Sequence, residues 1–212
     1  MGVDAHGLLT RPEALHAHVR AALAARGAVL RPLPTGARRA AVLLPLVHDA
    51  GEAGLLLTKR TDRVEHHKGQ ISFPGGAVEP GELPLHAALR ETHEEVGVNP
   101  ADVTILGSMD DEEAAVSGFM VSPFVGSIPH PYPFRPNPDE VGALLVAPIR
   151  GLLDPQNLRT ELWEHRGEPR TIYFFSVGSE VVWGATARII VRFLEAAFDV
   201  AVPLAGGRPR SG

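Results

Sequence analysis

The sequence contains no cysteine among its 212 residues. This absence excludes disulfide bonds, thiolate zinc sites, iron–sulfur clusters and a cysteine nucleophile. Any bound metal must therefore be held by carboxylates, carbonyls, imidazoles or water. A chain without cysteine suits a reducing compartment, so we expect a cytoplasmic location.

Long apolar runs and an excess of positive charge are also missing. No stretch approaches the roughly 20 apolar residues that span a bilayer. The first residues lack the basic and apolar regions of a secretory signal. The chain has 20 Lys and Arg residues against 25 Asp and Glu, a formal charge of −5. We therefore expect no nucleic-acid partner and no membrane partner, because both kinds of binding need clustered positive charge.

The length and the turn-forming residues predict one main domain with an N-terminal appendage. We expect a helix over 10–26, begun by a capping box of Thr10 and Glu13 and ended at Gly27. The prolines that follow fix the backbone and predict a linker, so residues 1–36 form the appendage. The main domain is expected over 37–202, and residues 203–212 are expected to form a flexible tail.

The main domain is predicted to have an α/β (α+β) fold in which helices pack against a mixed sheet. Strands and helices alternate without strict βαβ order, which favours this class over a purely parallel sheet. We expect helices over 83–96, 149–153 and 185–198. Apolar runs predict strands over 40–47, 55–58, 71–73, 103–106, 119–128, 141–146, 159–165 and 171–177.

The predicted helix over 83–96 carries three crowded carboxylates. Glu91, Glu94 and Glu95 are i, i+3 and i+4 neighbours, so they share one helix face. Their repulsion lowers helix stability unless a divalent cation neutralises it, and carboxylates are ligands that Mg²⁺ and Mn²⁺ prefer. A solvated acidic face is the alternative explanation. The glycine pair ending at Gly76 favours the cation, because glycine lets a backbone carbonyl approach closely.

The same segment resembles the Nudix box of the Nudix hydrolases, through the pattern Gly76-x5-Glu82-x7-Arg90-Glu91-x2-Glu94-Glu95-x-Gly97-Val98. Thr92 is the one departure, since the family usually has an aliphatic residue there. The resemblance implies an α/β/α sandwich that hydrolyses a nucleoside diphosphate linked to another moiety. Mg²⁺ or Mn²⁺ is the implied cofactor, held by Glu91 and Glu95, with Glu94 and the Gly76 carbonyl completing the metal shell.

Further segments are similar to the coenzyme A pyrophosphatase branch of that family: 56–60, 69–76, 137–141 and 183–188. The substrate implied by this branch is coenzyme A, which would yield 4′-phosphopantetheine and 3′,5′-ADP. Thr61 and Glu65 depart from the branch motif. A nucleotide sugar, a dinucleoside polyphosphate or an oxidised nucleoside triphosphate is therefore the alternative substrate. A non-catalytic nucleotide-binding module is the alternative of another class, and a homodimer is a possible assembly.

Several residues are candidates for roles beyond metal binding. The general base is predicted among Glu94, Glu140 and the pair Glu112 and Glu113, although residues 110–113 also fit a solvated acidic loop. Arg90 is also counted among the catalytic residues. We expect it to pair with Glu82 and so hold the loop that contains Glu82 on the helix. The candidates for binding substrate phosphates are Arg60, Lys68 and Gln70. Core positions are expected for Phe73, Trp183 and Phe193.

Overall fold

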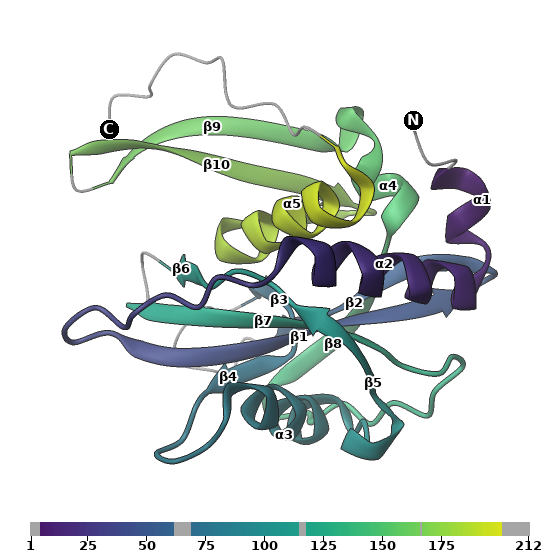
Figure 1. Cartoon of the computed structure of the whole chain (residues 1–212), viewed down its shortest axis with the longest axis horizontal. Coiled ribbons are helices and arrows are strands. Elements are labelled where there is room, and N and C mark those ends of the chain that lie inside the picture. Colours follow the sequence, from purple (N-terminus) through teal and green to yellow (C-terminus); the bar gives the residue numbers. More distant parts are fainter. Residues whose placement is uncertain (1–4, 62–68, 115–117, 166, 201–212) are drawn as a thin grey trace.

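The computed structural model describes residues 5–61, 69–114, 118–165 and 167–200 (Figure 1). Its centre is an eight-stranded mixed sheet. Strand β1 (Arg38–Asp49) is apolar on both faces, pairs antiparallel with β2 (Glu52–Arg60) and runs parallel to β7 (Phe119–Ser127). The other strands are β3 (Ile71–Ser72), β4 (Gly75–Ala77), β5 (Thr104–Ser108), β6 (Glu112–Ala114) and β8 (Val141–Pro148).

Helices cover both faces of this sheet, as Figure 1 shows. Helix α3 (Pro84–Val96) lies on one face, where Ala88 and Val96 join a buried cluster with Leu43. Helices α2 (Pro12–Arg26) and α5 (Gly184–Phe198) lie on the other face, over the larger apolar core. The α/β/α sandwich with a mixed sheet is therefore confirmed.

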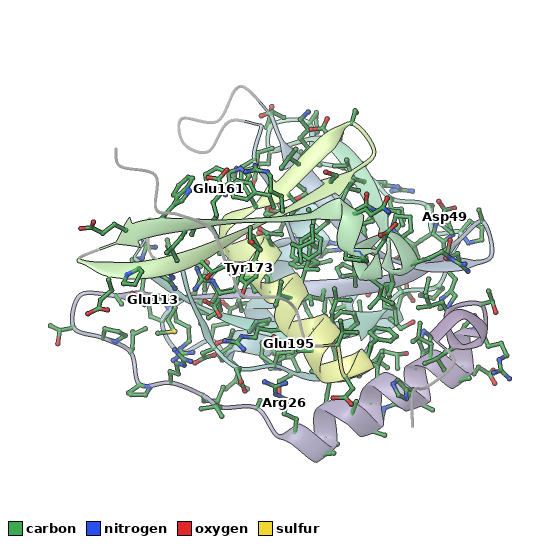
Figure 2. The ribbon with its side chains drawn as sticks, turned by 90° about the horizontal axis from the view of Figure 1, so that it is seen from above. Arg26, Asp49, Glu113, Glu161, Tyr173 and Glu195 are labelled. Carbon is green, nitrogen blue, oxygen red and sulfur yellow. The ribbon has the colours of Figure 1, made fainter. Side chains whose placement is uncertain are left out.

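A second sheet, absent from the prediction, covers the outer side of α5. It has three antiparallel strands, β9 (Leu158–His165), β10 (Glu168–Val177) and β11 (Glu180–Trp183). Figure 2 shows α5 passing across the β9–β10 hairpin, which carries Tyr173. The core positions predicted for Phe73 and Phe193 are confirmed, but Trp183 is 41 % exposed on the outer face of this sheet.

The N-terminal helix begins differently from the prediction. A short helix α1 (Ala5–Leu9) precedes it, and the Thr10 hydroxyl donates to the carbonyl of Gly7 instead of capping α2. The capping box is wrong because a proline follows Arg11: the residue before proline avoids helical geometry, whereas proline suits the first helical position. Leu15, Val19 and Leu23 of α2 are buried in the main core. The domain boundary after residue 36 stays a prediction.

The remaining elements follow the predicted order. The predicted strands and helices are present, with ends shifted by a few residues, and α4 (Ile149–Leu153) is where it was expected. The short strands β4, β6 and β11 and the 3-10 turns η1 (Pro100–Asp102) and η2 (Pro155–Asn157) were not predicted. Among the described helices, none is long and apolar enough to cross a bilayer.

Candidate active site

Glu95 is the most deeply buried acidic residue of the predicted metal site. It lies on the sheet side of α3 and is only 5 % exposed. The backbone N–H of Gly75 donates to Oε2 of Glu95 over 3.3 Å, which ties strand β4 to the helix. Burial, together with the nearby carboxylates of Glu140 and Glu91, raises the pKa of Glu95 to about 8, although the Gly75 hydrogen bond and the charge of Arg60 act against the rise.

Glu91 lies one turn before Glu95 and is held against the backbone of Gly76. A Cβ atom on Gly76 would meet the Cδ atom of Glu91 at 2.5 Å, so only glycine allows this approach. Burial raises the pKa of Glu91, while a hydrogen bond from Arg90 opposes that rise. The predicted closeness of Glu91 to the glycine backbone is therefore present in the structure.

Glu94 does not share this environment. Its side chain is 52 % exposed and forms a surface ion pair of 3.2 Å with Arg90. The sequence predicted one acidic face for Glu91, Glu94 and Glu95, but the helix separates them, with Glu95 turned toward the sheet and Glu94 toward solvent. The two side chains differ because neighbouring positions point about 100° apart around a helix.

Arg90 connects the helix to the loop that precedes it. Its guanidinium binds both carboxylate oxygens of Glu82, at 3.0 and 3.1 Å, and also donates to the carbonyl of Ala77 at 3.1 Å. A further bond of 2.8 Å reaches Oε1 of Glu91. The hydrogen bond from Arg90 lowers the pKa of Glu82. The predicted pairing of Arg90 with Glu82 is thus seen in the structure.

Glu140 reaches the same cluster from the loop before β8. It lies close enough to influence the pKa of both Glu91 and Glu95. Its side chain accepts a bond of 3.4 Å from Asn137, and its backbone carbonyl accepts one of 3.0 Å from the N–H of Thr61. The supporting role of Thr61 was missed because it depends on a contact between distant segments, whereas Asn137 lies only three residues before Glu140.

Arg60, at the end of β2, supplies positive charge to the cluster, since it lowers the pKa of Glu95. Its Nε atom is buried and has no hydrogen-bond partner among the described residues. The backbone N–H of Arg60 donates to the carbonyl of Gln70. Arg60 therefore pairs with Gln70, the residue just before β3, whereas Lys68 and Glu65 fall outside the described residues.

The acidic run over 110–113 has a different setting from the one predicted. Asp111 is buried and accepts bonds from Arg39 and Ser122, each 2.7 Å long. Glu112 forms ion pairs with Arg188 at 3.1 Å and Arg170 at 3.6 Å. The expectation of a solvated loop is wrong for these two residues, because arginines from other elements neutralise them and stabilise β6 against its neighbours.

The carboxylates of Glu91 and Glu95 fit a divalent cation by their chemistry. They are oxygen donors one helical turn apart, both have raised pKa values, and Glu140 adds a third acidic group nearby. Within the described part of the chain, no three acidic or histidine side chains form a finished metal site in this conformation. Arg90 contacts Glu91 directly, so it is the side chain that shares this carboxylate with any bound ion.

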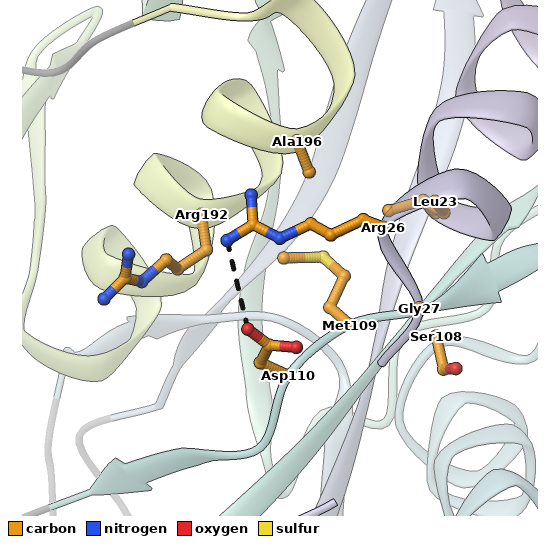
Figure 3. A pocket seen from close by; sticks show the side chains of 8 residues that line it. All are labelled: Leu23, Arg26, Gly27, Ser108, Met109, Asp110, Arg192 and Ala196. Carbon is orange, nitrogen blue, oxygen red and sulfur yellow. Dashed lines mark ion pairs between the residues drawn. The ribbon is translucent and has the colours of Figure 1, made fainter. Parts of the chain in front are cut away.

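One cavity in the structure is too small to hold a substrate. It lies between α2, α5 and the end of β5, and Figure 3 shows the ion pair of 3.9 Å between Arg26 and Asp110 beside it. Its volume of about 10 Å³ corresponds to about one water molecule. This cavity is therefore not a candidate for the reaction site.

Comparisons with known proteins agree with a site at the acidic cluster. A NUDIX domain model matches residues 37–166, which include the whole acidic cluster. A protein named "Uncharacterized Nudix hydrolase NudL" from Enterobacter sp. (strain 638) is 40 % identical over 140 residues, covering 66 % of this chain and 72 % of the relative. The NudL protein of Escherichia coli (strain SMS-3-5 / SECEC) is 38 % identical with the same coverage.

A solved structure, the MutT/nudix family protein from Enterococcus faecalis, has the same fold. It covers 89 % of this chain and 74 % of its own, with a TM-score of 0.54 and 17 % sequence identity. The domain match spans more than half of the chain and contains the residues that the structure gathers on α3. The chain therefore belongs to the Nudix hydrolase family, and it is a Nudix-type pyrophosphohydrolase.

Proposed function

We propose that this enzyme hydrolyses the diphosphate of coenzyme A to give 4′-phosphopantetheine and 3′,5′-ADP. The observation that carries the proposal is the convergence of the branch-like segments on the acidic cluster. The backbone N–H of Asn137 donates to the carbonyl of Glu95 at 2.8 Å. The hydroxyl of Thr186, within the segment 183–188, donates to the carbonyl of Ile71 at 3.2 Å.

The proposed metal ligands are Glu91 and Glu95, with Glu94 and the carbonyl of Gly76 as further candidates. Bound Mg²⁺ or Mn²⁺ would supply charge neutralisation on the diphosphate and would lower the pKa of a coordinated water. The burial of Glu95 supports this role, because a buried carboxylate gains more from a cation than an exposed one does.

Glu140 is our proposed general base in preference to Glu94. Glu140 lies near both proposed metal ligands, whereas Glu94 is half-exposed and paired with Arg90. A general base must lie within hydrogen-bond reach of the proton that it removes, either directly or through one water. In this role Glu140 takes a proton from the attacking water, while Arg90 keeps Glu91 in place.

Arg60 and Gln70 are proposed to hold the substrate phosphates, with Lys68 as a third candidate from the sequence. The buried Nε atom of Arg60 has no hydrogen-bond partner in the described part of the chain, which favours this role, because a phosphate oxygen would satisfy a buried donor. A nucleotide sugar, a dinucleoside polyphosphate or an oxidised nucleoside triphosphate remains the alternative substrate, motivated by Glu65. Cytoplasmic location and a homodimer remain predictions from the sequence.

A substrate panel tests this proposal. The protein is assayed with Mg²⁺ and with Mn²⁺ on coenzyme A and on one member of each alternative class, and products are identified by mass spectrometry. We expect the highest kcat/KM for coenzyme A, with 4′-phosphopantetheine released. A higher kcat/KM for another class would replace coenzyme A as the substrate. Absence of hydrolysis throughout would favour the non-catalytic nucleotide-binding module instead.

A further inference from the structure

A groove with a volume of about 530 Å³ runs along strand β8. Residues 143–146 of β8 form one side of it, and residues 177–180, which join β10 to β11, form the other. The volume lies within the range of roughly 300–1,000 Å³ that is usual for small-molecule sites. The groove is therefore large enough for part of a substrate.

Strand β8 forms an edge of the main sheet. Among the described strands, only β2 pairs with it, in the register that places Ala143 beside Lys59. In an antiparallel strand, alternate backbone groups point away from the paired neighbour. An edge strand thus offers N–H and C=O groups to an extended molecule that lies beside it.

The groove begins next to the acidic cluster. Ala143 follows Glu140 by three residues, which is about 10 Å along a strand. Lys59 lines the groove from the sheet face opposite to Arg60, because successive residues of a strand point to opposite faces. Leu144 and Val146, which also line the groove, pack with the apolar cluster that includes α3 residues, so they lie on the face of the acidic cluster. A substrate whose diphosphate lies at the cluster can therefore extend along β8 toward this side of the groove.

The lining of the groove selects an uncharged ligand. Among the described residues that line it, the only charged side chains are Lys59 and Glu180, which neutralise each other in an ion pair of 2.6 Å. Leu144, Leu145 and Val146 of β8 line it and are apolar and partly exposed, with Leu145 on one face of the strand and the other two on the opposite face. Apolar side chains beside a strand edge suit a chain that alternates aliphatic carbons with amide groups, as an added peptide strand does.

We propose that this groove binds the uncharged, amide-bearing arm of the substrate, with the arm lying along the free edge of β8. This inference rests on the proposed function, because coenzyme A joins such an arm to its diphosphate. A nucleotide sugar has a hydroxyl-rich group in that place, and a nucleoside triphosphate has no group there. The groove would therefore distinguish coenzyme A from a nucleotide sugar and from a nucleoside triphosphate.

The test fills the groove and compares two substrates. Ala143 is exposed, so Ala143→Phe narrows the groove without entering the core. The matched control is Thr104→Phe, at an exposed position of β5, the opposite edge strand. The substrates are coenzyme A and an analogue with a methyl group in place of the arm, which keeps the 3′-phosphoadenosine diphosphate.

We expect Ala143→Phe to raise KM for coenzyme A by about tenfold, with kcat and the kinetics of the methyl analogue nearly unchanged. The control variant should behave as the unsubstituted protein does. Equal KM values for coenzyme A in both variants would overturn the groove proposal alone. Failure of the unsubstituted protein to hydrolyse coenzyme A would overturn the proposed function, and the groove proposal with it.

Two further measurements test binding in the groove without relying on catalytic turnover. 4′-Phosphopantetheine is titrated into the unsubstituted protein, and the backbone amide signals of β8 are followed by NMR. We expect shifts at residues 142–146, and shifts confined to other segments would contradict the proposal. The mass of each variant in solution is measured too. If Ala143→Phe changed the oligomeric state and raised KM equally for both substrates, the groove would instead be a contact surface for a second copy of the chain.

Discussion

The carboxylate of Glu91 lies so close to Gly76 that a Cβ atom there would approach its Oε1 atom to 2.6 Å. The Glu91 carboxylate on α3 therefore lies directly against the backbone of strand β4. Glycine is needed at this position because of the approach of the carboxylate, since a methyl group would occupy the same space. Glu91 is thus placed by the backbone of the preceding loop as well as by its own helix.

Gly76→Ala should therefore displace the carboxylate of Glu91 while the protein stays folded. The clashing atoms belong to the end of a flexible side chain, so the helix need not move. We expect kcat to fall by about tenfold or more, because misplacement by about 1 Å is costly in an active site. Steady-state kinetics and a thermal melt measure the two effects. Full activity would mean that Glu91 need not lie against Gly76.

Glu91→Gln and Glu95→Gln should each remove most of the activity and preserve the fold. Glutamine keeps the shape of the side chain but removes the negative charge that binds the cation. We expect kcat to fall by about 100-fold or more, as it does when other electrostatic groups are removed from active sites. Glu168→Gln, at an exposed position of β10, is the matched control. Undiminished turnover in both variants would rule out the proposed metal ligands.

Arg90 should be coupled energetically to Glu82. Lysine lacks the planar fork that reaches both carboxylate oxygens, so Arg90→Lys loses the bidentate contact. Urea unfolding of the two single variants, Arg90→Lys and Glu82→Gln, and of the double variant gives the coupling. We expect about 1 kcal/mol. A coupling near zero would show that the ion pair does not stabilise the loop on the helix.

The sequence predicts the position of the helix that carries the site, but it does not predict which of the helix's acidic side chains are buried. The helix over 83–96 follows from local signals, an apolar stripe and Gly97, and these need no tertiary contact. The sequence did not predict that Glu95 would be buried and Glu94 exposed, because that difference depends on how the helix packs on β1. Asp111 and Glu112 were misjudged because their arginine partners lie in distant segments.

Divalent cations should stabilise the folded protein through the same carboxylates. A ligand that binds only the native state at 100 times its Kd adds about 2.7 kcal/mol to the free energy of unfolding. Mg²⁺ or Mn²⁺ should therefore raise Tm by several degrees in the unsubstituted protein and in Glu168→Gln. The double variant of Glu91→Gln with Glu95→Gln should show little increase. An equal rise in that variant would place the stabilising ion elsewhere.

The free energy of unfolding should also depend on pH through two histidines far from the proposed reaction site. His16 of α2 and His48 of β1 pack edge to face, with ring centroids 5.7 Å apart. Burial lowers the pKa of both, and the charge of His16 lowers that of His48 further. His16 also contacts the hydroxyl of Ser127 through Nε2 at 2.9 Å.

The direction of the dependence follows from proton linkage. The unfolded chain protonates these histidines near their ordinary pKa of about 6.5, whereas the folded protein resists protonation to a lower pH. At these two histidines the unfolded state therefore binds more protons below that value, so their contribution to stability should fall as pH drops from about 7 to about 5, while the raised pKa of Glu95 acts in the opposite direction in every variant. His48→Leu should lose less stability over this range in urea unfolding, while His86→Gln, at an exposed position of α3, should keep the original slope. If His48→Leu lost as much stability as the unsubstituted protein, the acid sensitivity would have to arise from other groups, because leucine cannot bind the proton.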